Sequence, residues 1–233
     1  MKITVIHGQD HKGSTYNIAK LLMQEISCEK EINEFFLPRD LNHFCAGCYA
    51  CIKDETKCQY YLEKNIIMQK IESSDLLIFT TPNYCMAPTA PMKAFMDLTF
   101  TYWFSHKPRA CMLGKKAIVI SSTAGAGAKQ AIKPVKRMLL YWGVPWIRSY
   151  AVSVQAMGWD GVAQKKKDRI AGDMKALAKG LSKEKKPYVP LKTKLMFTMF
   201  ANMQKAGFGC GAEEKKYWED KGWLGKERPW KNK

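Results

Sequence analysis

The chain has 233 residues, of which 46% are hydrophobic and 25% charged, and its formal net charge is +17. This length suits one domain with an appendage, and the absence of an eighteen-residue apolar run excludes a transmembrane helix. The opening MKITVIHG lacks the pattern of a signal peptide, so we expect a cytoplasmic protein with reduced thiols. In that setting, eight cysteines favour metal or redox roles over disulfides.

The net positive charge comes entirely from the second half of the chain. Residues 1–114 contain 12 Lys/Arg and 12 Asp/Glu, whereas residues 115–233 contain 26 and 9. A basic half can attract nucleic acid, anionic lipid or acidic redox partners. The excess is mostly lysine, without the aromatic interleaving of nucleic-acid motifs, so we expect a solubilising surface and no nucleic-acid partner.

Short apolar runs alternate with segments of helical spacing over most of the chain. The runs predict strands at residues 2–7, 31–37, 76–80, 117–121 and 146–154. The helical spacing predicts helices at residues 16–26, 62–72, 90–100, 130–141 and 162–181. This alternation predicts an α/β fold, with a three-layer, doubly wound, parallel five-stranded sheet over residues 1–185. Ligands of such sheets bind outside the carboxyl ends of the strands.

Residues 186–233 are expected to form a basic, aromatic-rich, helical C-terminal arm. Pro187 and Pro190 separate it from the last predicted helix, and residues 191–206 are amphipathic to nearly all-apolar. We expect the arm to pack across its own domain or a partner subunit, and therefore expect a dimer. The alternatives are contact with an anionic membrane surface or a lid over a ligand, formed by Trp218, Trp223 or Trp230.

Four cysteines follow the second predicted strand with the spacing C-x2-C-x2-C-x6-C: Cys45, Cys48, Cys51 and Cys58. Iron–sulfur clusters are held by four thiolates, and runs with two-residue gaps supply them. Two other interpretations stay open. The loop can hold reduced thiols beside a substrate, or the same four sulfurs can bind zinc.

The loop after the first strand, GQDHKGST, leads directly into a helix. A helix N-terminus presents unpaired N–H groups and a positive dipole, so a phosphate fits there. The loop lacks the dinucleotide and Walker patterns, which favours a phosphomonoester over a pyrophosphate. The alternative is an ordinary turn in which Ser or Thr caps the helix.

Two more loops follow the third and fourth strands. Two prolines stiffen residues 81–88, where Tyr84 and backbone amides can flank a flat heteroaromatic ring. Small residues at 121–128 let the backbone approach a ligand closely. Taken alone, residues 81–88 are also explained as a rigid connector and residues 121–128 as a flexible loop. The three loops are, however, expected at the same edge of the sheet, and together they favour a ligand site there.

These segments resemble the flavodoxin-like NAD(P)H-dependent FMN reductases, and within them the iron–sulfur flavoprotein branch. The resemblance covers about residues 2–180 and rests on GQDHKGST, CAGCYACIKDETKC and SDLLIFTTPNYCMAPTAPMKAFMD. It implies bound FMN, with NAD(P)H as co-substrate. The chain departs from the family in the first loop, where Gly-Ser-Pro-Arg is common and Gln9, Asp10 and His11 stand here, without the arginine that would bind phosphate.

Carried over by position, the resemblance assigns residues to three groups. The FMN phosphate is assigned to Gln9, His11, Lys12, Ser14 and Thr15. The ring and ribityl side are assigned to Pro82, Asn83, Tyr84, Cys85, Met86, Thr123, Ala124 and Gly125. A 4Fe–4S cluster close to the flavin is assigned to Cys45, Cys48, Cys51 and Cys58. No catalytic side chain is expected, because the flavin supplies the chemistry.

The expected function is that of an FMN-dependent oxidoreductase. It would pass electrons from NAD(P)H through FMN to a quinone, a free flavin, a nitro or azo compound, or a redox protein. One alternative is an FMN/iron–sulfur electron carrier that exchanges electrons with ferredoxin-like partners. Another is a membrane- or nucleic-acid-binding module on a vestigial flavin fold.

Overall fold

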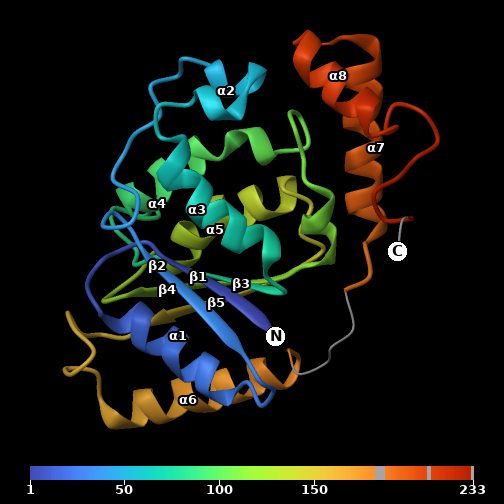
Figure 1. Ribbon diagram of the computed structural model, residues 1–233. Helices are drawn as coiled ribbons and strands as arrows, with labels where there is room; N and C mark the ends of the chain where they lie inside the picture. The colour runs from blue at the N-terminus through green and yellow to red at the C-terminus, as the bar shows by residue number, and fades with distance from the viewer. Residues whose placement is uncertain (182–186, 209–210, 232–233) are drawn as a thin grey trace.

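The computed structural model describes residues 1–181, 187–208 and 211–231. Its sheet has five parallel strands in the order β2-β1-β3-β4-β5 (Figure 1). The strands are β1 Lys2–His7, β2 Glu31–Phe36, β3 Leu76–Thr80, β4 Lys116–Thr123 and β5 Trp146–Ser153. This order confirms the predicted doubly wound sheet: β2 is added on one side of β1, and β3, β4 and β5 are added on the other side.

Helices cover both faces of the sheet. One face is covered by α1 Ser14–Glu25 and α6 Gln164–Lys179, and the other by α3 Tyr61–Ser73, α4 Ala90–Leu98 and α5 Ala128–Tyr141 (Figure 1). All five residues of β3 are buried, as a strand covered on both faces requires. The edge strands β2 and β5 keep exposed positions, which explains why their apolar patterns are weaker.

Successive side chains of the central strands enter two separate cores. Leu76 and Ile78 pack beneath α1 and α6, whereas Leu77 and Phe79 pack beneath α3, α4 and α5. In the second core, the Phe79 ring lies 6.3 Å from that of Trp142, edge to face. These two cores fix where each strand ends and therefore where the loops begin.

Several short elements were not predicted. They are α2 Ala50–Lys53, α8 Ala212–Asp220 and the 3-10 turns η1 Glu55–Lys57, η2 Phe100–Tyr102 and η3 Ala110–Gly114. Segments of three to nine residues are too short for a clear periodicity. The helix predicted to reach residue 100 ends at Leu98, because the Thr99 hydroxyl donates to the Phe95 carbonyl at 2.8 Å and a 3-10 turn follows.

The arm packs on residues 99–114 of the same chain. Helix α7 Leu191–Ala206 and α8 build a third core, in which Phe197, Trp218 and Trp223 surround Phe104 and Leu113. Trp218 Nε1 donates to the His106 carbonyl at 2.6 Å, and the Trp218 side chain is fully buried. Packing of the arm on its own domain is therefore confirmed.

The structure also bears on the lid and membrane interpretations of the arm. Trp218, Trp223 and Trp230 all pack around Phe197, at ring distances of 4.9, 5.3 and 5.2 Å, and so do not form a lid over the carboxyl edge. The expected boundary between residues 185 and 186 lies outside the described residues. In the described parts of the chain, no helix has both the length and the apolarity needed to span a bilayer.

Candidate functional site

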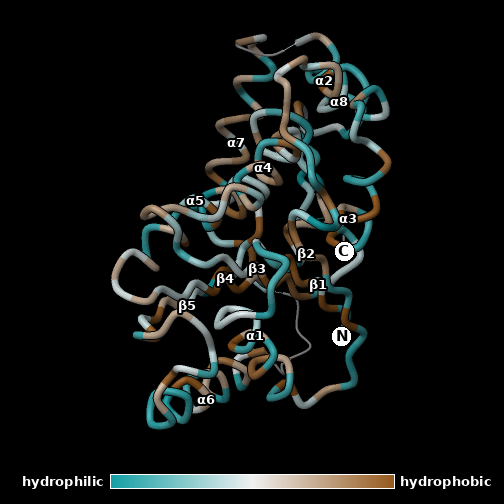
Figure 2. Tube along the Cα trace, turned by 90° about the vertical axis from the view of Figure 1, so that its left-hand side faces the viewer, coloured by the Kyte–Doolittle hydropathy of each residue, from teal (hydrophilic) through white to brown (hydrophobic). Residues whose placement is uncertain are grey.

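The loops after β1, β3 and β4 meet at the carboxyl edge of the sheet, which faces the viewer in Figure 2. Side-chain hydrogen bonds link these loops to one another. The Thr89 hydroxyl donates to the Gly8 carbonyl at 2.5 Å, linking the second loop to the first. Asn83 Nδ2 donates to the Ala126 carbonyl at 2.9 Å, linking the second loop to the third. The sequence-predicted flavin residues are therefore brought to one edge.

Gly8 leaves no room for a side chain where the first loop begins. Its N–H donates to the Thr80 carbonyl at 2.7 Å. A Cβ atom on Gly8 would lie 2.8 Å from Thr89 Oγ1 and 2.9 Å from the Thr80 carbonyl oxygen. The close approach of the ends of β1 and β3 to the N-cap residue of α4 therefore requires glycine at this point.

Helix α1 begins at Ser14 without a side-chain cap. Its N-cap residue is Gly13, and within the described part of the chain no side chain caps it. The interpretation of Ser14 or Thr15 as an N-cap is therefore wrong, since both lie inside the helix. The first turn also lacks acidic residues, while His11 and Lys12 are exposed beside it. This helix start can accept an anion.

The second loop contains a tight turn with unusual backbone angles. Tyr84 and Ala87 exchange two backbone hydrogen bonds, at 3.1 and 3.0 Å, around Cys85 with φ 50° and Met86 with φ 60°. Two positive φ angles define a type I′ turn, which usually contains glycine or asparagine. Each non-glycine residue there costs about 1–2 kcal/mol, and such strain concentrates at ligand sites. Tyr84, Cys85 and Met86 are all exposed.

Asn83 holds the second and third loops together. Its backbone N–H donates to the Ser122 carbonyl at 3.0 Å, in addition to the side-chain bond to Ala126. Asn83 Oδ1 is buried and has no hydrogen-bond partner among the described residues. A buried carbonyl oxygen normally has a donor, so a bound ligand with an N–H or O–H group fits beside it.

The third loop packs tightly at one end and is open at the other. Gly127 has φ 99°, and a Cβ there would lie 2.6 Å from both Asn83 Nδ2 and Met86 Sδ. In contrast, a Cβ on Gly125 would meet no heavy atom within 4 Å. Thr123 Oγ1 donates to the Ala126 carbonyl at 2.9 Å, which fixes the loop and leaves the Ala124–Gly125 backbone exposed.

Sequence reasoning missed Arg39 and Gly127. Arg39 follows β2, and one of its Nη atoms lies 3.4 Å from Asp10 Oδ1 in the first loop. Its guanidinium also lies 4.7 Å from the Phe36 ring centroid. Thus an arginine reaches the first loop from another segment. The strand order would have indicated this, because β2 pairs with β1 and their carboxyl ends are adjacent.

The residues at this edge fit FMN. The uncapped start of α1 with His11 and Lys12 suits the phosphate. The partnerless Asn83 Oδ1 and the exposed backbone of the third loop suit a flat ring with polar edges. Of the predicted residues, Thr15 is buried within α1, so only its backbone can take part.

The four predicted metal ligands line one small cavity of about 20 Å³, here called the cysteine cavity. All four are free thiols: Cys51 is buried, Cys58 half-buried, and Cys45 and Cys48 exposed. Burial raises the pKa of the Cys51 thiol. The cavity lies where the start of α3 meets the end of α4, with α2 beside α8 (Figure 1).

The cysteine cavity supplies thiols of the kind that hold zinc or a cluster, but it is not arranged as a preformed metal site in the described structure. No three or more His, Cys, Asp or Glu side chains in the described ranges are arranged as ligands of one metal ion. Zinc would require its four sulfurs to converge on one point, whereas four thiolates around a cluster are spread out. The four cysteines match the ligands of a cluster in number and kind, but the cavity of about 20 Å³ is too small to hold one without a shift of the cysteine-bearing loop. The cavity and the second loop lie at opposite ends of α4, about 12 Å apart along its axis.

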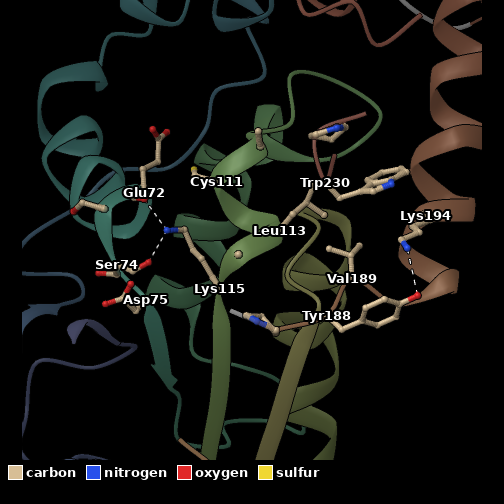
Figure 3. A pocket seen from close by; sticks show the side chains of 15 residues that line it. Glu72, Ser74, Asp75, Cys111, Leu113, Lys115, Tyr188, Val189, Lys194 and Trp230 are labelled. Carbon is tan, nitrogen blue, oxygen red and sulfur yellow. Dashed lines mark hydrogen bonds between the residues drawn. The ribbon is translucent and has the colours of Figure 1, made fainter. Parts of the chain in front are cut away.

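A larger cavity, of about 690 Å³, lies at the opposite, amino edge of the sheet (Figure 3). It is bounded by residues 72–75 and 110–115 on the domain side and by the arm on the other. Lys115 is buried beside it and donates to the Glu72 and Ser74 carbonyls, both at 2.6 Å. Burial lowers the pKa of Lys115. None of the predicted site residues lines this cavity.

Comparison with known proteins agrees with the fold. A model of the flavodoxin-like fold family matches residues 1–181. An iron-sulfur flavoprotein from Archaeoglobus fulgidus is 27% identical over 115 residues, which cover 49% of this chain and 50% of the relative. An iron-sulfur flavoprotein from Clostridioides difficile is 31% identical over 146 residues, covering 60% and 62%. The chain thus spans about half to three-fifths of the length of these curated relatives.

Solved structures show the same fold. An FMN-dependent NADH-azoreductase from Bacillus anthracis, in complex with FMN, has a TM-score of 0.60 at 14% identity, covering 78% of this chain and 100% of that one. FerB, an NAD(P)H:(acceptor) oxidoreductase from Paracoccus denitrificans, has a TM-score of 0.51 at 20% identity, covering 76% and 95%. Because the family model matches residues 1–181, more than three-quarters of this chain, the chain belongs to the flavodoxin-like fold family.

Proposed function

We propose that this chain is an FMN-dependent oxidoreductase that takes electrons from NAD(P)H and passes them to a second acceptor. The observation that carries the proposal is the joined set of three loops, in which Asn83 Oδ1 is buried without a partner. The similar solved structures named as an FMN-dependent azoreductase and an NAD(P)H:(acceptor) oxidoreductase support it. The acceptor class comprises quinones, free flavins, nitro or azo compounds and redox proteins.

Bound FMN would supply the hydride acceptance and electron transfer that no side chain provides. The chain's own residues bind and orient it. Lys12, His11 and the first-turn amides of α1 hold the phosphate, and Arg39 adds a guanidinium from beside Asp10. Asn83 accepts a hydrogen bond from the ring edge, and the strained turn presents Tyr84 to the ring face.

The test is an anaerobic titration of flavin-free protein with FMN, followed by stopped-flow mixing with NADH or NADPH. We expect saturable quenching of flavin fluorescence and then rapid bleaching of the bound flavin by one of the nucleotides. A protein that binds no FMN, even with FMN in large excess, overturns the proposal. Bleaching by reduced ferredoxin alone would instead favour the electron carrier.

We also propose that the cysteine cavity holds a 4Fe–4S cluster. Four cysteines on one wall support this, as do the names of the two curated relatives. Anaerobic purification, with analysis of iron, sulfide and zinc and an absorption spectrum, tests it. Iron and sulfide with a broad visible band support the cluster. Zinc, or metal-free thiols after reconstitution with iron and sulfide, overturns it.

We further propose that the protein forms a homodimer. The outer face of α7 exposes Leu191, Leu195 and Met199 at four-residue spacing, a stripe that a second copy would cover. Sedimentation equilibrium tests this. A monomer at all accessible concentrations overturns it.

A further inference from the structure

Lys64 is a buried cation without a partner. It lies on α3, and only 3% of its surface is exposed. Its Nζ atom is buried and makes no hydrogen bond with any residue of the described ranges. Burying an ammonium group without an anion or acceptor is strongly unfavourable. A charged Lys64 side chain would therefore destabilise the empty protein.

The position of Lys64 within α3 places it next to the cysteine cavity. The core-facing stripe of this helix consists of Lys64, Ile67, Met68 and Ile71, a spacing at which an apolar residue would be expected at the first position. One turn earlier is Tyr60, whose carbonyl accepts the Lys64 N–H at 3.1 Å and which lines the cavity. Lys64 thus continues the stripe toward the cavity wall.

The charged groups around Lys64 also associate it with the cysteine cavity. Burial, followed by the neighbouring Cys58 and Cys45, raises the pKa of Cys51, and the Lys64 charge opposes that rise. The nearby acids already have other partners: Glu63 contacts His43, and Glu55 binds Arg109 at 2.7 Å. The Lys64 charge acts on the Cys51 thiol, and metal binding would require that side chain as a thiolate.

We propose that Lys64 is the counter-cation of the cysteine cavity and compensates the negative charge that four thiolates bring there when they hold an iron–sulfur cluster. This inference rests on the proposed cluster. One-electron reduction adds one more negative charge to a cluster, so a fixed cation nearby stabilises the reduced form. Lys64 is then a positioning residue that sets cluster affinity and potential without itself binding iron.

The test compares wild type with Lys64→Met, Lys64→Arg and the control Lys57→Met. Lys57 is also a lysine, adjacent to Cys58, but it is exposed and therefore screened by water. Each full-length protein is reconstituted anaerobically with iron and sulfide, and the cluster is titrated with dithionite and redox mediators. We expect Lys64→Met to disfavour the reduced cluster about tenfold, equivalent to about 59 mV for one electron. Lys64→Arg and Lys57→Met should remain close to wild type.

A second readout does not need the cluster. Metal-free Lys64→Met should unfold at a higher urea concentration than metal-free wild type, because a buried unpaired charge has been removed. If Lys64→Met fails to fold, Lys64→Gln replaces it. Suppose that the wild type binds iron, and that Lys64→Met has the same cluster potential and retains as much iron as the wild type. This result overturns the role of Lys64 but leaves the cluster proposal standing. A wild type that takes up no iron overturns the cluster proposal and this one together.

Discussion

His7 Nε2 lies 2.8 Å from Glu34 Oε2, and this contact joins the carboxyl ends of β1 and β2 directly beneath the first loop. The His7 side chain is buried, its ring stacks on Phe36 at 4.4 Å, and its Nδ1 lies 3.1 Å from Thr80 Oγ1. One imidazole thus connects three adjacent strands at the point where the FMN phosphate is proposed to bind.

Glu34→Gln should change how stability depends on pH. The hydrogen bond with His7 lowers the pKa of Glu34 below its ordinary 4.5, with burial opposing the shift. A lowered carboxyl pKa stabilises the fold above the unfolded-state pKa, and this contribution disappears as the pH falls through the folded-state pKa. Because the carboxylate is partly in water, we expect a difference from wild type of at most about 1 kcal/mol at neutral pH. Urea unfolding should show this difference vanish as the pH falls through the folded-state pKa of Glu34.

Substitutions at Gly127 and Gly125 separate folding from flavin binding. Gly127→Ala should destabilise the metal-free, flavin-free protein by about 1–3 kcal/mol, because the new Cβ would clash with Asn83 and Met86 at positive φ. Gly125→Ala should leave stability within about 0.5 kcal/mol of wild type yet weaken FMN binding, since the open backbone there faces the proposed ring. Urea unfolding and FMN titration measure the two effects. Unchanged FMN affinity in Gly125→Ala would place the ring elsewhere.

Met86→Gly should relax the strained turn. Glycine adopts positive φ without penalty. Flavin-free Met86→Gly should therefore be more stable than flavin-free Met86→Ala by about 1 kcal/mol. The alanine variant is the control, because it removes the same side chain but keeps the strain. Thermal unfolding of both variants measures the difference. Equal stabilities would contradict the I′ turn.

Trp218→Ala should detach the arm. The indole is fully buried and donates to the His106 carbonyl, so its loss should cost about 3–5 kcal/mol. The matched control is Lys216→Ala on the exposed side of α8, with an expected change within about 0.5 kcal/mol. Limited proteolysis should cleave the arm of Trp218→Ala faster than that of the control. Equal protection would show that the other arm contacts suffice.

The arm should also respond to acid through Glu214. Burial raises the pKa of this carboxyl, but hydrogen bonds from His106 at 2.6 Å and from the Gly211 N–H outweigh burial and hold it below 4.5. Its stabilisation is thus present above the unfolded-state pKa and lost as the pH falls through the folded-state pKa. Acidification should expose Trp218 and shift its fluorescence to the red. Glu214→Gln should remove this transition, and the exposed Glu213→Gln should retain it.

Local sequence patterns were sufficient to predict the sheet and the positions of the loops at its carboxyl edge. The run Leu76–Thr80 is wholly apolar up to its last residue because both faces of β3 are covered, and this is visible from sequence alone. The same holds for the three loops, since parallel strands must place their carboxyl ends together. The family resemblance then assigned most of the residues now found at that edge.

Contacts between distant segments could not be predicted. His106 and Glu214 are 108 residues apart, and nothing local to either indicates the pair. Lys64 occupies a position with apolar spacing, so only the fold reveals that a charge is buried beside the cysteines. Helix α1 begins at Ser14, two residues before the predicted start, so Ser14 and Thr15 lie inside the helix and do not cap it. A difference of two residues is within the uncertainty of helix boundaries predicted from sequence.

The third core also has a consequence for synthesis on the ribosome. Phe104 and Leu113 are translated well before their partners Phe197 and Trp218. The sheet can form as soon as β5 and α6 emerge, since folding proceeds from the N-terminal side during translation. Until the arm follows, the nascent domain carries an uncovered apolar surface at residues 99–114, so that interval is when chaperone binding and self-association should be greatest.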